Sequence, residues 1–205
     1  MTWAAATVEV ARRDPAFVPV IERAGPARLR TRDPDGPYGA LVRAVVYQQL
    51  AGKAAAAIHG RVRALVAGPL TPEAVLALPV EALRAAGLSA AKTASVLDLS
   101  ARAAAGELAL AGLSRLPDED IVTRLIAVRG IGRWTAEMFL IFQLRRLDVW
   151  PIGDLGVREG WRLAHGLDAQ PTPGQLALLG DPLRPVRSVA AWYCWQAVHI
   201  ARGEL

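Results

Sequence analysis

The sequence predicts an all-α fold. Apolar residues recur at the spacing of one helix face through most of the chain, and hydrophobic residues, many of them alanine, make up 53% of it. The stretches between these segments are short and rich in glycine and proline, which interrupt helices. Runs that alternate apolar and polar residues, as a half-buried strand would, are sparse. We therefore expect about ten helices joined by short turns, without a sheet.

Start and stop signals divide the chain into these helices. Thr71 followed by Pro72, for example, is a cap followed by a proline in a first helical turn. The predicted helices cover 38–50, 54–66, 72–86, 89–105, 117–126, 133–144, a segment that follows 154, and a last one from about 188. The stretch before 38 is rich in proline and charge, so we expect it to wrap back on the body rather than fold alone.

Composition restricts the function classes. The net charge of +5 suits a polyanionic partner such as nucleic acid, although arginines spread over a solvated surface would give the same sum. The single cysteine excludes an internal disulfide and an all-cysteine iron–sulfur cluster, and the three histidines lack zinc-ligand spacing. No apolar run reaches the roughly 20 residues of a membrane span, and no signal peptide is evident. We expect a cytoplasmic protein without membrane contact.

The segment 125–136 contains the most informative pattern. One predicted helix ends, Gly130 and Gly132 follow two residues apart, and Arg133 opens the next helix. Glycine permits positive φ and leaves the backbone bare, so the first amides of the second helix can bind a DNA phosphate beside Arg133. The carbonyl groups in the turn suit a hard monovalent cation, either Na⁺ or K⁺. The alternative is an ordinary corner in which the glycines only permit the bend.

This segment resembles the helix-hairpin-helix of the DNA glycosylase superfamily that bears that name. In that superfamily an aspartate follows the hairpin at a Pro-x-x-Asp-type turn, and 150–156 contains such a turn with Asp154. The resemblance extends from about Tyr38 to Trp195. It implies a two-lobed helical fold with a cleft between the lobes. The candidate ligands of the monovalent cation are the carbonyls of Ile126, Val128 and Ile131.

Asp154 is the candidate catalytic residue. Base excision passes through an oxocarbenium-like sugar, which a carboxylate stabilises while it orients a water molecule. A base that is already cationic from alkylation leaves without a second acid, so one carboxylate suffices. The alternative role, a helix N-cap, is compatible with catalysis because capping would fix the carboxylate in place.

The resemblance also implies a pocket for an alkylated base. Trp134 stands where lyase members of the superfamily place a nucleophilic lysine, so hydrolysis without strand cleavage is expected. Trp134 and Trp195 resemble the pocket tryptophans of the alkyl-base branch, the 3-methyladenine DNA glycosylase II type. Indole faces attract a cationic methylated purine. The remaining pocket candidates are Met138, Tyr47 and Trp192, the last of which is equally well read as core.

The segment 46–55 resembles the loop with which this family fills the hole left by an extruded base. Gln49 falls at the wedge position with Leu50 beside it, and an inserted side chain offsets the unstacking. Without the resemblance, an amphipathic helix end with solvated glutamines would be the simpler interpretation. The predicted DNA contacts comprise Gly130, Gly132, Arg133, Thr135, Gln48, Gln49, Leu50 and Lys53.

These features together predict a monomeric, nucleoid-associated DNA glycosylase. The chain is expected to be a single domain, 1–205, in which 38–145 forms a helical barrel with the hairpin and 1–37 plus 146–205 form the second lobe. It would excise 3-methyladenine, 7-methylguanine and related bases from double-stranded DNA without a required cofactor. A non-catalytic helix-hairpin-helix protein and an oxidised-purine or mismatch glycosylase remain as alternatives.

Overall fold

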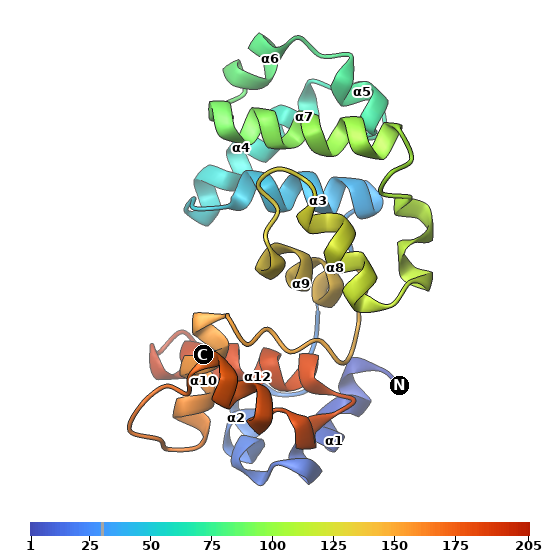
Figure 1. Cartoon of the computed structure of the whole chain (residues 1–205). Helices are drawn as coiled ribbons and strands as arrows, with labels where there is room; N and C mark the ends of the chain where they lie inside the picture. Colours follow the sequence, from blue (N-terminus) through green and yellow to red (C-terminus); the bar gives the residue numbers. More distant parts are fainter. Residues whose placement is uncertain (30) are drawn as a thin grey trace. The chain divides into compact units, whose positions relative to one another are not determined.

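The computed structural model describes residues 1–29 and 31–205, and all regular elements in these ranges are helices (Figure 1). The prediction of an all-α fold is therefore confirmed. The α-helices are α1 (Trp3–Arg13), α2 (Val18–Ala24), α3 (Gly36–Tyr47), α4 (Gly52–Ala64), α5 (Pro72–Leu76), α6 (Val80–Ala85), α7 (Ala90–Ala104), α8 (Asp118–Ile126), α9 (Arg133–Phe142), α10 (Leu155–Ala164), α11 (Pro173–Leu179) and α12 (Arg187–Ala201). Short 3₁₀ helices cover Pro15–Phe17, Leu110–Arg115 and Asp181–Leu183.

The chain divides into two compact units. Unit 1 comprises Met1–Arg30 and Arg145–Leu205, and unit 2 comprises Thr31–Leu144. Unit 1 is thus built from both ends of the chain, and unit 2 from the uninterrupted middle.

The N-terminal stretch contains two helices that the sequence reading did not predict. Thr2 caps α1 by accepting the amide of Ala5, and α1 buries Ala6 and Val10. Both α1 and α2 pack against α12 of the same unit. The prolines and charged residues of the stretch before 38 obscured the apolar positions of these helices.

Unit 2 is a bundle around α3 and α7. Helix α3 packs on α4, α7 and α9, while α5 and α6 pack on α7. Helix α8 has three acidic residues in its first turn, and their negative charge interacts favourably with the positive end of the helix dipole. This helix packs on α9. The fully buried side chains of α3 and α7 include Leu41, Val42, Val45, Val46, Val96 and Leu99.

Unit 1 is organised by the close packing of α10 on α12 (Figure 1). Gly160 of α10 lies directly over the backbone of α12. A Cβ at this position would overlap the carbonyl group of Cys194 and lie 2.5 Å from its Cα. The Cys194 side chain is buried, and burial raises the pKa of its thiol well above the ordinary value. Glycine at 160 is therefore required for the observed approach of the two helices.

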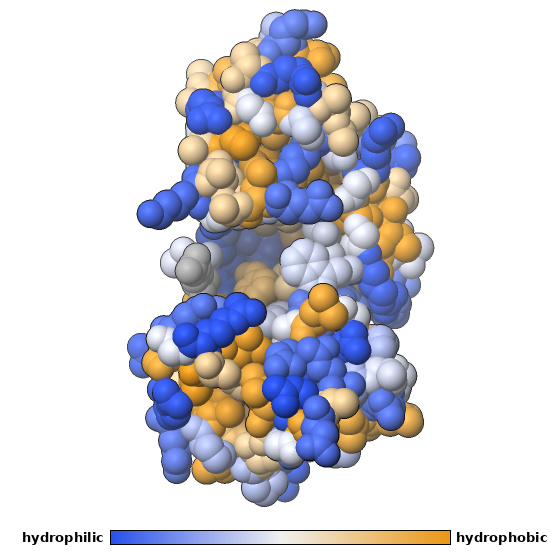
Figure 2. All heavy atoms as spheres, turned by 90° about the vertical axis from the view of Figure 1, so that its left-hand side faces the viewer, coloured by the Kyte–Doolittle hydropathy of each residue, from blue (hydrophilic) through white to orange (hydrophobic). Residues whose placement is uncertain are grey.

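Hydrophilic and hydrophobic residues are interspersed on the face of each unit that Figure 2 presents. Large apolar side chains such as Val8, Leu155 and Leu178 are exposed in unit 1. Isolated exposed apolar residues are usual on protein surfaces. Among the described residues, no helix has the length and apolarity that a membrane crossing needs.

Candidate active site

The hairpin turn, defined here as Ala127–Gly132, connects α8 to α9 in unit 2. Gly130 has φ 77°, a conformation that glycine permits, whereas Gly132 has φ −94° and does not use this freedom. Gly132 is the N-cap of α9 without a side chain to satisfy the helix amides, and a Cβ there would meet nothing within 4 Å. The bare backbone therefore faces open space, which is the property that phosphate binding requires.

Two predicted DNA contacts of the hairpin have partners within unit 2. Arg133 is exposed and pairs with Glu119 and with Glu137, whose Oε1 is 3.2 Å from the Arg133 Nε. The hydrogen bond to Glu119 raises the pKa of the guanidinium. Thr135 is only 5% exposed, so its hydroxyl faces the interior of the unit, and Gln48 donates to it over 3.4 Å. Any phosphate contact of Arg133 must therefore compete with two carboxylates.

The predicted wedge lies in a tight loop after α3. We define the wedge loop as residues 48–51. Gln49 adopts φ 55°, the left-handed region that non-glycine residues seldom occupy. Gln49 and Leu50 are both exposed, as a side chain that enters DNA must be. Lys53 follows, also exposed, in the first turn of α4.

Gln48 connects the wedge loop to the hairpin turn. Its Nε2 donates to the carbonyl oxygen of Gly130 over 2.9 Å. Two predicted DNA-contact segments, separated by some eighty residues in sequence, are thus joined by a side-chain hydrogen bond.

The candidate catalytic carboxylate is the N-cap of α10 in unit 1. Asp154 Oδ1 accepts the amide of Val157 over 2.8 Å, and the Asp154 amide closes the preceding turn on the carbonyl of Pro151. Asp154 therefore caps α10, and its negative charge lies at the positive end of the helix dipole. Asp154 is 8% exposed, so the carboxylate is held in a largely dehydrated position.

Trp195 of α12 makes a second contact with the same oxygen. Its Nε1 donates to Asp154 Oδ1 over 3.0 Å, so one carboxylate oxygen receives both an amide and an indole hydrogen bond. Gly156 makes this approach possible. A Cβ at 156 would lie 2.9 Å from Trp195 Cδ1 and 3.1 Å from the carboxylate oxygen.

The sequence reading did not single out Gly156 and Gly160. Their separation by four residues places them on one face of α10, the face that packs on α12. That spacing of two small residues was the available signal for a close helix crossing.

The other predicted pocket residues have varied surroundings. Trp134, 51% exposed, and Met138 are four residues apart on α9, so they share a face in unit 2. The Tyr47 ring meets His59 edge-on and lies 4.9 Å from the guanidinium carbon of Arg43. Trp192 packs against the core of unit 1, with its ring perpendicular to that of Tyr193.

The carbonyl groups proposed for a cation fit a monovalent ion in their chemistry. The amide of Ile131 donates to the carbonyl of Val128 over 3.1 Å. A carbonyl oxygen has two lone pairs, so this hydrogen bond leaves capacity for an ion. Ile126 is the last residue of α8, and Ile131 lies within the hairpin turn.

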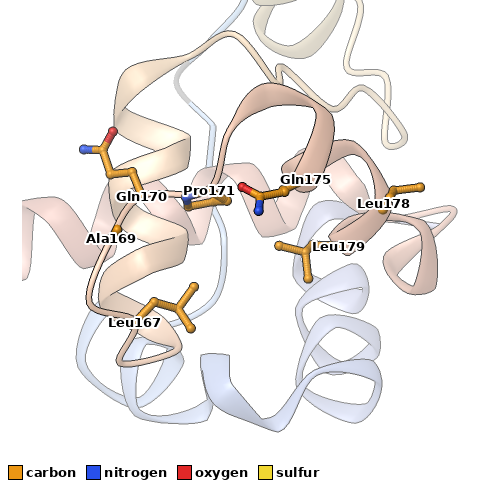
Figure 3. Close-up of a pocket in the computed structure, with 7 residues that line it drawn as sticks. All are labelled: Leu167, Ala169, Gln170, Pro171, Gln175, Leu178 and Leu179. Atoms are coloured by element: carbon orange, nitrogen blue, oxygen red, sulfur yellow. The ribbon is translucent and has the colours of Figure 1, made fainter.

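A separate groove of about 450 Å³ lies in unit 1 (Figure 3). Residues of the loop after α10 and of α11 line it, namely Leu167, Ala169, Gln170, Pro171, Gln175, Leu178 and Leu179. None of the predicted site residues is among them. Over the described ranges, no group of three or more His, Cys, Asp or Glu side chains is arranged to hold a metal ion.

Comparison with known proteins gives consistent results. A family model described as "HhH-GPD superfamily base excision DNA repair protein" matches residues 42–185. The chain is 38% identical over 181 residues to DNA-3-methyladenine glycosylase 1 of Schizosaccharomyces pombe, which covers 84% of this chain and 77% of that protein.

Two solved structures are similar to this chain over nearly its whole length. A DNA-3-methyladenine glycosidase of Bacillus halodurans has a TM-score of 0.86 at 35% identity, covering 97% of this chain and 91% of that one. The S. pombe 3-methyladenine DNA glycosylase in complex with abasic DNA has a TM-score of 0.82 at 35% identity, covering 94% and 95%. With the hairpin and the capped aspartate, these matches show that the chain belongs to the HhH-GPD superfamily of base excision DNA repair proteins.

Proposed function

We propose that this protein is a monofunctional DNA glycosylase of the 3-methyladenine glycosylase II type, which hydrolyses the N-glycosidic bond of alkylated bases in double-stranded DNA. The observation that carries the proposal is the fixed carboxylate of Asp154, bound by the Val157 amide and the Trp195 indole. The names of the similar proteins from S. pombe and B. halodurans support the same substrate class.

The chemistry needs one fixed negative charge. As the bond from C1′ to the base nitrogen breaks, its electron pair moves to the cationic alkylated base, which leaves neutral. Asp154 stabilises the positive charge that develops on the sugar and orients a water molecule. The water oxygen bonds to C1′ and releases its proton, so the products are the free base and an abasic site. A carboxylate that is already fixed requires little reorganisation during this step.

The lysines of the chain support hydrolysis without strand cleavage. A lyase needs an uncharged amine to form a Schiff base. The sequence has only Lys53 and Lys92, and the family resemblance places Trp134 where lyase members have their nucleophilic lysine. The Lys92 Nζ donates to the carbonyls of Val46 and Gln48, both over 2.7 Å. Lys53 lies on α4, outside the hairpin.

An excision assay tests the substrate class and the hydrolytic reaction together. Duplexes that each contain one 3-methyladenine, 7-methylguanine, 1-methyladenine or ethenoadenine would be incubated with and without borohydride. We expect release of at least one alkylated base and no trapped protein–DNA adduct, with a known glycosylase/lyase trapped in parallel. Binding without any release would favour the non-catalytic alternative, and a trapped adduct would contradict the role given to Trp134.

The indole donor of Trp195 gives a second prediction. Trp195→Phe keeps an aromatic ring but removes the hydrogen bond to Asp154, so we expect the single-turnover excision rate to fall about tenfold, as for loss of a hydrogen bond to a charged group. Trp161→Phe is the matched control, because Trp161 lies in the core of the same unit and stacks on His165. An unchanged rate in Trp195→Phe would mean that the indole does not act on the carboxylate.

The same proposal includes three further features. The enzyme works as a monomer, it has a cytoplasmic, nucleoid-associated location, and a Na⁺ or K⁺ ion at the hairpin carbonyls strengthens phosphate binding. Replacing all small monovalent cations in the solution by a bulky organic cation would then weaken DNA binding.

A further inference from the structure

One face of α7 contacts both of the segments assigned to DNA binding. Lys92, Ser95 and Asp98 are spaced three residues apart, so their side chains project from the same side of the helix. All their partners described below belong to unit 2.

Lys92 supports the wedge loop. Helix α3 ends at Tyr47, where the last carbonyls have no partner within the helix. The Lys92 ammonium donates to the carbonyls of Val46 and Gln48, both over 2.7 Å. A cation at a helix C-terminus is also favoured by the helix dipole. These two hydrogen bonds bracket the end of α3 directly before Gln49, which has the left-handed conformation.

Ser95 and Asp98 support the hairpin turn. A Cβ at Gly130 would overlap the Ser95 hydroxyl and lie 3.3 Å from the Ser95 Cβ, so the turn sits directly on α7. Asp98 Oδ2 accepts the amide of Arg129 over 2.8 Å. The lack of a side chain at Gly130 is therefore needed for the contact of the turn with Ser95, and Gly130 also has positive φ, which glycine permits.

Gln48 completes a closed set of contacts. Its carbonyl accepts from Lys92, and its side chain donates to the carbonyl of Gly130, which lies against Ser95. The wedge loop and the hairpin turn are therefore joined to each other and to the same helix face. Removal of one contact leaves the wedge loop with fewer constraints on the position of Gln49.

We propose that Lys92 is a positioning residue for base extrusion, which fixes the wedge loop on α7 so that Gln49 is presented at a set distance from the phosphate-binding hairpin turn. This inference rests on the proposed function, which supplies the role of Gln49. Lys92 acts through the backbone of the loop and does not itself contact DNA.

The test compares binding to two duplexes, one with a tetrahydrofuran abasic-site analogue and the same duplex undamaged. A wedge that fills a gap raises affinity only for the first. We expect Lys92→Met to reduce the ratio of the two affinities by about tenfold. A side chain that fills the gap compensates part of the free energy lost when the bases unstack, and a misplaced Gln49 would lose that compensation. Gln49→Ala should have a similar effect. Adding Lys92→Met to Gln49→Ala should cause no further loss, because both changes remove the same contribution.

Salt dependence separates positioning from direct phosphate binding. The slope of log affinity against log salt concentration should be the same in Lys92→Met and in the unaltered protein, whereas loss of a phosphate contact reduces it by about one. A reduced slope, or an equal loss in the Gln49→Ala background, would overturn the proposal.

Arg84→Met is the matched control. Arg84 also donates to a backbone carbonyl of unit 2, that of Leu88 over 3.0 Å, and this hydrogen bond joins two residues outside the wedge loop and the hairpin turn. Its affinity ratio should match that of the unaltered protein. An equal loss in Arg84→Met would show that general destabilisation accounts for the effect, and the proposal would fail.

Gln48→Leu keeps the test decisive if Lys92→Met does not fold. It leaves the Lys92 contacts to the backbone and removes the donor to Gly130. We expect the affinity ratio to fall by about threefold or more, in the range set by one lost hydrogen bond. An unchanged ratio would mean that the loop and the turn are not coupled.

The two proposals fail in different ways. If the unaltered protein prefers the abasic duplex but releases no alkylated base, the proposed function fails. The ratio of the two affinities in Lys92→Met then still tests the positioning role. If it releases bases and Lys92→Met retains both the preference and the rate, only the positioning role fails.

Discussion

Asp154→Asn is expected to lower the single-turnover rate of alkylated-base excision by about 100- to 1,000-fold, the range found when one preorganised electrostatic contact to a transition state is lost. The amide keeps an oxygen that can accept from Val157 and Trp195, and asparagine caps helices as well as aspartate does. The substitution therefore removes the charge and leaves the geometry.

Two further variants separate charge from capping. Asp154→Ala removes both, so it should be inactive and also less stable by about 1 kcal/mol. Thr172→Ala removes a cap elsewhere in unit 1, where Thr172 accepts the amide of Gln175, and should lose stability without losing activity. If Asp154→Asn excises 3-methyladenine at the normal rate, the mechanism proposed for Asp154 is wrong.

Gly160→Ala is expected to reduce the free energy of unfolding of unit 1 by about 3 kcal/mol, at the upper end of the usual cost of overpacking. The added Cβ meets backbone atoms of Cys194, which cannot rotate away as a side chain can. Helices α10 and α12 must separate, and this moves Trp195 away from Asp154. Excision should therefore fall in the fraction that remains folded.

Urea unfolding monitored by tryptophan fluorescence measures this effect. Five of the six tryptophans belong to unit 1, so the signal reports mainly on that unit: Trp3, Trp150, Trp161, Trp192 and Trp195. Gly174→Ala is the matched control in α11, where a Cβ meets nothing within 4 Å, and it should stabilise by about 0.5 kcal/mol. Equal midpoints for the two variants would contradict the close packing of α10 on α12.

The sequence was most informative where local chemistry determines the conformation. The hairpin glycines, the arginine that follows them and the aspartate after a proline turn each have a local signature, and each occurs at the predicted helix boundary. The φ of either glycine could not be predicted, because glycine permits positive φ without requiring it. Of the two hairpin glycines, Gly130, which lies on Ser95, has positive φ and Gly132 does not.

Features that depend on distant residues were not predictable. Lys92 reads as an ordinary helix lysine until α7 is placed beside the end of α3. Similarly, the bond from Trp195 to Asp154 joins residues 41 positions apart and depends on the glycines between α10 and α12. Helix α1 was missed because its apolar stripe is short and its partner, α12, is near the other end of the chain. Packing, rather than propensity, decides these cases.

The discontinuous construction of unit 1 has a consequence for biosynthesis. Its N-terminal helices pack on α12, and Tyr193 of α12 donates to Thr7 and to the carbonyl of Gly25. During translation, residues 31–144 emerge as a complete folding unit, while the first segment must wait for α12. Trp195 reaches Asp154 only at that last stage. Under the mechanism proposed for Asp154, a nascent chain would thus complete the unit with the hairpin turn before the unit with the candidate carboxylate, and base excision would begin only after α12 has been synthesised.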